Sequence, residues 1–188
     1  MLADFLQDRA AQYVSGAMPA AERDSFEVIA GFHPEFRAQV ADLQAALTQV
    51  ALEGAAPVTP PPALRSRLLG ALDTLPPAPE PEGWVVTDAT GRVEWINPAF
   101  TAMCGYSLDE LKGRKPGPLL QGPDTDPAGV ERIRAALRTR SACEVTLVNY
   151  HKDGTRYRAG IRLAPVLDDA NQPVWFVARE QKLPDPAG

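Results

Sequence analysis

The side chains that could carry out covalent or acid–base chemistry are spread along this sequence and do not form motifs. The two cysteines, Cys104 and Cys143, lie far apart and lack the short spacing of a metal site. Ser107 and Asp109 are close to each other, but no histidine lies at a spacing that would complete a nucleophilic site. The sequence also has no glycine-rich phosphate loop and no kinase signature. These observations predict a protein that is not an enzyme.

The two histidines and the methionine beside Cys104 do not indicate a haem site. A haem needs an axial His, Met or Cys in a buried pocket. His151 lies in a predicted turn and His33 lies in the N-terminal part of the chain, whereas Met103 suits an ordinary place in an apolar core. We therefore expect neither haem nor a bound metal.

The composition is that of an acidic globular protein. The formal net charge is -5, with 45% hydrophobic and 23% charged residues. Nucleic-acid binding depends on Lys and Arg side chains that neutralise phosphates, so an acidic chain suits a protein partner better. The sequence contains no signal-peptide pattern and no apolar run of about 20 residues. We therefore expect a soluble cytoplasmic protein without a membrane segment, and two isolated thiols suit that reducing compartment.

Prolines divide the chain into two units. Two groups of four prolines lie at 57–62 and 76–81, and each should end a helix because proline lacks the amide donor and restricts the preceding residue. Between them, four leucines of residues 63–72 share one helical face. This short helix could dock on the first unit or act as a lever between the two units. The predicted units are a helical domain over 1–56, a proline-rich linker over 57–82, a β-rich domain over 83–182 and a tail over 183–188.

The first unit has the apolar spacing of amphipathic helices. The predicted helices run over 2–16, 19–31 and 34–52. Pro19 suits a helix start and Gly31 suits a helix end. Leu47 and Val50 continue the apolar stripe of the third helix, so we expect them in a small three-helix core.

The second unit changes to the two-residue alternation of strands. The predicted strands are two within 84–97 around Gly91, followed by 144–150, 156–166 and 173–179. Short helical pieces are predicted within 98–120, and a longer helix begins at Asp126, a candidate N-cap. The predicted fold class is α+β: a small all-α domain followed by a five-stranded antiparallel sheet with helices on one side.

Residues 83 to 181 resemble the PAS family in the order and spacing of their motifs. The motifs are WINPAF at 95–100, GYSLDEL at 105–111, GRKP at 113–116, LQGPDTDP at 120–127, IRAA at 133–136, NYHKDG at 149–154 and WFVA at 175–178. Within this family, residues 120–127 and 149–154 are especially similar to the flavin-binding light-oxygen-voltage (LOV) group. The resemblance implies a sensor domain.

The sequence departs from the LOV pattern at the reactive thiol. In that group, a cysteine in the helix before the Leu-Gln-Gly segment adds to the photoexcited flavin. Residues 115–121 read KPGPLLQ, with no cysteine and one extra residue. Cys104 lies too early and Cys143 lies on a later strand, so we expect no photoadduct.

The polar flavin contacts of the LOV group are also depleted. Asn149 fits the first amide position, whereas Ala159 replaces a second asparagine and Glu180 replaces a glutamine. Gln121 and Arg134 could face a ribityl chain or phosphate, although such residues also cap backbone or lie in solvent. If FMN or FAD binds, the expected contacts are Gln121, Arg134, Asn149 and Glu180. The sequence favours a core filled by side chains or an unknown metabolite over a bound flavin.

The first unit resembles bacterial anti-sigma domains. The similar segment is YVSGAMPAAERDSFE at 13–27, with its Gly-x-x-Pro-x-x-Glu turn and Phe-Glu pair. Many of those domains bind zinc through a His-x-x-x-Cys-x-x-Cys motif, but the corresponding positions here are Ile29, His33 and Phe36. The resemblance is to the zinc-free members, so we expect no zinc.

Together, these resemblances imply a signal-transduction protein in which the PAS domain regulates the helical unit. The family's helices wrap a sigma factor, so the expected partner is a sigma factor or another regulatory protein, and a homodimer is expected. The alternative is a ligand- or flavin-binding PAS sensor whose helical unit serves only for dimerisation.

Overall fold

The computed structural model describes residues 4–53, 61, 63–67 and 82–184. Of the short helix predicted over 63–72, residues 64–67 are helical and residues 68–72 lie outside the described residues. Most of the predicted linker and tail also lie outside them. Below, the head is residues 4–53 and the sensor domain is residues 82–184.

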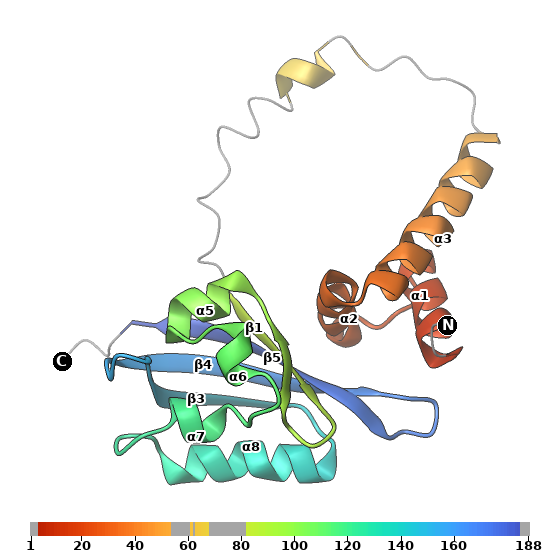
Figure 1. Cartoon of the computed structure of the whole chain (residues 1–188). Helices are drawn as coiled ribbons and strands as arrows, with labels where there is room; N and C mark the ends of the chain where they lie inside the picture. Colours follow the sequence, from red (N-terminus) through yellow and green to blue (C-terminus); the bar gives the residue numbers. More distant parts are fainter. Residues whose placement is uncertain (1–3, 54–60, 62, 68–81, 185–188) are drawn as a thin grey trace.

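The sensor domain is built on a five-stranded antiparallel sheet with strand order β2-β1-β5-β4-β3 (Figure 1). The strands are β1 (Gly83–Asp88), β2 (Val93–Ile96), β3 (Cys143–Tyr150), β4 (Arg156–Leu167) and β5 (Pro173–Leu183). Successive side chains of a strand point to opposite faces of the sheet, and apolar side chains are buried on both faces. Both faces are therefore covered by other elements. Gly91 forms the predicted turn between β1 and β2 with a φ of 80°.

Four helices cover one face of the sheet, which we call the inner face (Figure 1). They are α5 (Pro98–Cys104), α6 (Leu108–Leu111), α7 (Gly117–Leu120) and α8 (Pro127–Thr139). Asp126 is the N-cap of α8, as predicted, and its carboxylate accepts hydrogen bonds from the Ala128 and Gly129 amides. The predicted α+β class and the sheet with helices on one side are therefore confirmed for this domain.

The head contains three helices, α1 (Asp4–Ser15), α2 (Ala20–Phe32) and α3 (Pro34–Glu53). The prediction that Gly31 ends the second helix was wrong, because α2 continues through Gly31 to Phe32. His33 then adopts an extended conformation, with φ -105° and ψ 99°. Since proline disfavours the helical region for the residue before it, Pro34 sets this helix end.

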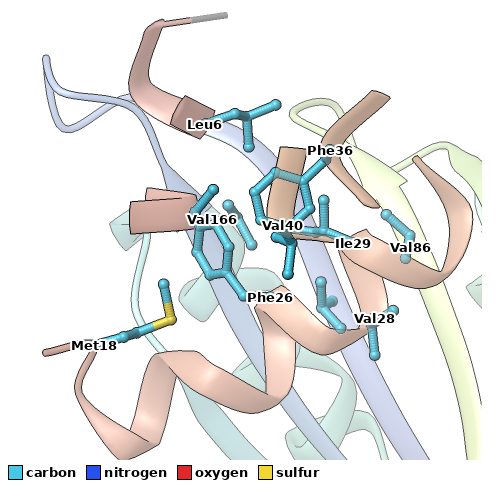
Figure 2. Packing of buried hydrophobic residues seen from close by; sticks show 11 residues of the cluster. Leu6, Met18, Phe26, Val28, Ile29, Phe36, Val40, Val86 and Val166 are labelled. Atoms are coloured by element: carbon cyan, nitrogen blue, oxygen red, sulfur yellow. The ribbon is translucent and has the colours of Figure 1, made fainter. Parts of the chain in front are cut away.

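The head has a small core formed by all three helices (Figure 2). Leu6, Ile29 and Phe36 are almost completely buried there, and the Phe26 and Phe36 rings lie 5.6 Å apart. The expectation that Leu47 and Val50 also join this core was wrong. They are 50% and 69% exposed, because α3 continues beyond the helices that it packs against (Figure 1).

The head packs on the outer face of the sheet, opposite α5 to α8. Val86, Val166 and Val177 of the outer face belong to the same buried cluster as the head residues. Figure 2 shows Val86 and Val166 beside the head residues of this cluster. Three partly buried tryptophans, Trp84, Trp95 and Trp175, pack against that cluster. The outer face is therefore an intramolecular interface, which the sequence patterns did not predict.

In the part of the chain that the structure describes, no helix is both long enough and apolar enough to cross a membrane.

Candidate ligand-binding cavity

A cavity of about 460 Å³ lies between the inner face of the sheet and the helices α7 and α8. Its size is within the range of small-molecule sites in proteins. Most of its wall is apolar and comes from Val85, Val130, Ile133, Leu137, Leu147, Ile161, Leu163 and Phe176. Polar groups enter this wall at a few points, which is the usual way in which a site fixes the orientation of a ligand.

The segment between α7 and α8 lies beside the cavity and is held against β3 by hydrogen bonds. The Thr125 hydroxyl donates to the Val148 carbonyl at 2.6 Å and accepts from the Gly122 amide at 3.0 Å. Gly129 allows α8 to approach β3 closely, because a Cβ there would lie 2.5 Å from a methyl group of Leu147. Gln121 ends α7 at the cavity wall, and its backbone amide donates to the Gly117 carbonyl.

Asn149 of β3 and Glu180 of β5 are the most deeply buried polar side chains that line the cavity. They are 2% and 6% exposed, respectively. The Glu180 Oε2 atom is buried and has no hydrogen-bond partner among the described residues. Burial alone raises the pKa of Glu180 from 4.5 to about 7, because an ionised carboxylate is poorly stabilised away from water. Glu180 is thus a carboxyl group whose neutral form is favoured in the folded protein.

Tyr157 lies near this pair and also has an unused polar atom. It is the direct cross-strand partner of Asn149, and its buried hydroxyl has no hydrogen-bond partner among the described residues. Burial, followed by the charges of Glu180 and Cys104, raises the pKa of Tyr157, which therefore stays neutral. Neutral groups that can donate hydrogen bonds thus gather at this end of the inner face.

Two exposed basic residues also line the cavity. Arg134 of α8 lines the cavity, but its side chain is 65% exposed and lies 3.9 Å from Glu131. Lys115, in the segment before α7, also lines the cavity. A ligand with an apolar ring system and an anionic tail fits this arrangement, with the ring between the sheet and α8 and the tail at the basic rim.

All four residues expected from the sequence to contact a flavin, Gln121, Arg134, Asn149 and Glu180, line this single cavity. Sequence reasoning missed Lys115, which lines the cavity, and Tyr157, which is the cross-strand partner of Asn149 but does not itself line the cavity. Lys115 belongs to residues 115–121, the segment that lacks the LOV cysteine. The Tyr157 side chain lies on the same face of β4 as that of Ala159, two residues away. The two thiols, Cys104 and Cys143, are not among the cavity-lining residues.

The positions in the head that correspond to the zinc motif are used for packing and capping. Ile29 and Phe36 are buried in the head core. The His33 Nδ1 atom accepts a hydrogen bond of 3.3 Å from the Phe36 amide, at the start of α3. Within the described residues, no group of three or more His, Cys, Asp or Glu side chains could hold a metal ion.

Comparisons with known proteins agree with this architecture. A family model described as "PAS domain" matches residues 81–179, which is just over half of the chain. A blue-light photoreceptor of Listeria monocytogenes is 34% identical over 104 residues, which is 54% of this chain and 40% of the photoreceptor. A blue-light-activated histidine kinase of Brucella abortus is 35% identical over 74 residues, which is 39% of this chain and 15% of the kinase. The chain thus spans well under half the length of these relatives.

Solved structures of LOV domains are similar to this chain in both fold and sequence. The light-state structure of the blue-light photoreceptor Aureochrome1 LOV has a TM-score of 0.53 and 32% identity, and the match covers 63% of this chain and 90% of that one. The LOV domain of the Erythrobacter litoralis EL346 blue-light-activated histidine kinase has a TM-score of 0.53 and 30% identity, over 56% of this chain and 98% of that one. A structure described as "Flavin Analogue Sheds Light on Light-Oxygen-Voltage Domain Mechanism" has a TM-score of 0.54 and 29% identity, over 63% and 86%. The chain therefore belongs to the PAS domain family, and its sensor domain is of the LOV type.

Proposed function

We propose that this protein is a signal-transduction sensor in which the occupancy of the cavity controls whether the head stays docked on the sheet. The released head would bind a sigma factor or another regulatory protein. The observation that carries the proposal is that one sheet forms the cavity wall on its inner face and the head-docking surface on its outer face. A ligand that shifts the strands at the cavity therefore also changes the surface that holds the head.

Strand β5 gives this coupling a short path. Glu180 lines the cavity, and the preceding residue, Arg179, pairs on the outer face with Asp24 of α2 and with Glu82. The Arg179 guanidinium also lies 4.7 Å from the Trp84 ring centroid. A change in the twist or position of β5 at Glu180 is thus transmitted directly to the side chain that joins the sheet to the head.

The docked state would compete with a protein partner for the head. Val28 and Phe32 of α2 are part of the packing between the head and the outer face. The resemblance of residues 13–27 to anti-sigma domains supports a sigma factor as the partner, since those domains bind through their helices. Docking on the sheet would hide apolar surface of the head until a ligand releases it.

We further propose that the cavity binds a flavin without forming a covalent bond. Asn149 and Glu180 would contact the ring edge, while Gln121, Arg134 and Lys115 would lie toward the ribityl chain and phosphate. A bound flavin would supply a chromophore and a redox-active ring. Because residues 113–121 contain no cysteine and neither thiol lines the cavity, the signal would be flavin binding or flavin redox state and not a cysteinyl adduct.

The test is a binding measurement between the full chain and purified extracytoplasmic-function-type sigma factors from the same organism. An Asp24→Arg substitution places a cation against Arg179 and should release the head, so this variant should bind a sigma factor more tightly than the wild type. Asp109→Arg is the matched charge reversal, because Asp109 is exposed on α6, which covers the other face of the sheet. Equal binding by all three proteins, or no binding by Asp24→Arg, would reject the regulated-head proposal.

The second candidate function is a ligand-binding sensor whose head dimerises the protein. It is favoured by α3, where the exposed Leu47 and Val50 continue the apolar stripe of Val40 and Leu43. We expect a Leu47→Glu/Val50→Glu variant to be a monomer by light scattering if this stripe forms the dimer contact. A wild-type protein that is itself a monomer would exclude this candidate.

A further inference from the structure

We infer that Glu180 contacts the ligand as a neutral carboxylic acid, so that binding in the cavity is coupled to a proton held on this side chain. The inference rests on the proposed flavin site and specifies its chemistry. The ligand class is a planar heterocycle whose edge presents hydrogen-bond acceptors, and the side chain that selects it is Glu180.

The first reason is the geometry of the carboxyl group. Glu180 is almost fully buried, lines the cavity, and carries an oxygen atom that no described residue satisfies. An unpaired polar atom at such a depth is costly unless a ligand or water completes its hydrogen bonds. The unpaired carboxyl is thus available to a ligand.

The second reason is that none of the described residues places a cation at this carboxyl group. Its cross-strand partners, Gly83 on β1 and Ile161 on β4, carry no charge. From β4 and α5 the nearby titratable groups are Tyr157 and Cys104, which would add negative charge if they ionised. The pKa values of both groups are raised, so both stay protonated and neither supplies a charge that would stabilise an ionised Glu180.

The basic groups of the site are directed elsewhere. Lys182, two residues along β5, lies 5.0 Å from the Tyr157 ring centroid. Arg134 of α8 pairs with Glu131 at the exposed rim. The raised pKa of Glu180 is therefore caused by burial and is not offset by a nearby cation. A neutral carboxyl group can donate a hydrogen bond through its proton, whereas an ionised one can only accept.

The ring edge of an oxidised flavin has carbonyl and imine acceptors. A neutral Glu180 would donate to one of them, but an ionised Glu180 would place negative charge against them. Asn149 has both a donor and an acceptor at any pH and can orient the ring. The complex therefore requires the proton on Glu180, and deprotonation should weaken binding.

The test measures the Kd of FMN for the apo full chain from about pH 5.5 to about pH 8.5, by quenching of flavin fluorescence. For the wild type, we expect the Kd to rise about tenfold per pH unit above about pH 7. Calorimetry in buffers of different ionisation enthalpy should show net proton uptake on binding above pH 7. Glu180→Gln should lose the rise in Kd and the proton uptake above pH 7, because the amide donates at every pH. The phosphate of FMN loses its second proton near about pH 6 and should affect both proteins equally.

Glu144→Gln is the matched control, since Glu144 is an exposed carboxylate on β3 that pairs with Arg162. It should retain the wild-type pH dependence. If FMN binds to the wild type and to Glu180→Gln with the same pH dependence, the inference about Glu180 is overturned while the flavin site stands. If neither protein binds FMN at any pH, the proposed flavin site fails and the inference fails with it.

Discussion

Phe32 of α2 stacks on Trp95 of β2, with ring centroids 5.8 Å apart and an interplanar angle of 25°. This pair joins the end of the second head helix to the edge of the sheet. Phe32 also meets Trp175 of β5 edge-on, at 5.8 Å and 89°. A single head side chain thus contacts two strands that are distant in sequence, which makes it a sensitive position for testing the docked state.

We expect Phe32→Ala to shift the head toward the undocked state. An aromatic pair contributes about 0.5 to 1.5 kcal/mol beyond its buried area, so losing two such contacts should change the docking equilibrium by about tenfold or more. Hydrogen exchange of the α2 amides should become faster, while exchange in α8, on the other face of the sheet, should change little. Phe32→Leu keeps most of the apolar area and should have a smaller effect. Unchanged exchange in the alanine variant would mean that this contact does not hold the head.

The ion pair between Asp24 and Arg179 should make docking sensitive to salt. Both side chains are partly exposed, so Asp24→Ala should weaken docking by about 0.2 to 1 kcal/mol, and added salt should reduce this difference. Limited proteolysis of the head at low and high ionic strength would measure the effect. Glu22→Ala breaks a pair with Arg9 inside the head and serves as the control. Equal protection of the two variants at low salt would contradict the prediction.

Asn97 should be important for the stability of the sensor domain. Its Oδ1 atom accepts from the Phe100 and Trp84 amides, both at 2.9 Å, and its Nδ2 donates to the Glu82 carbonyl at 2.8 Å. Asn97→Ala should lower the free energy of unfolding by about 2 kcal/mol, since it removes the α5 cap and leaves a β1 amide unpaired.

Asn97→Asp is the control for this cap. It keeps the acceptor and loses the donor, so it should lose less stability than the alanine variant. Chemical denaturation of the variants would measure the changes. An alanine variant as stable as the wild type would show that water replaces these hydrogen bonds.

The stability of the apo protein should decrease as the pH rises through the range set by Glu180. Its pKa is about 7 in the folded protein and near 4.5 when the chain is unfolded. Between these values the folded state holds a proton that the unfolded state has lost, so raising the pH favours unfolding. The contribution is fully present below pH 4.5 and falls by about 1.4 kcal/mol per pH unit until it is lost above about pH 7.

Denaturation of the wild type and of Glu180→Gln at several pH values would measure this contribution. The glutamine variant lacks the titrating group, so its stability should decrease less over the same range. Parallel pH profiles for the two proteins would show that Glu180 does not titrate as its burial suggests.

The sensor domain could be predicted from the sequence because its signals are local. Alternating β-branched and aromatic residues marked the strands, Gly91 marked the first turn and Asp126 capped α8, so the elements agree with the structure within a few residues. The largest difference is β5, which continues to Leu183 through pairing with β4 that the polar residues after Arg179 did not suggest. The four proposed ligand contacts also came from this domain, where motif spacing fixed their places.

The arrangement of the head could not be predicted in the same way. The stripe through Leu47 and Val50 has the spacing of a buried face, but burial depends on which helices reach that far. The docking of the head depends on pairs such as Phe32 and Trp95 that have no local signature. A hint was present in Trp84, Trp95 and Trp175, since large apolar side chains on the outer face of a sheet indicate that another element covers it.

The order of the elements along the chain has a consequence for synthesis on the ribosome. The head is translated first, whereas Trp175 and Val177 of its docking surface are translated more than 120 residues after α3 ends. At about 5 to 20 residues per second, the nascent head would wait about 6 to 24 s before its covering surface is complete. During that interval its apolar side is open to chaperones and to any partner already present. A binding partner could therefore capture the head during translation, before the sensor domain has folded.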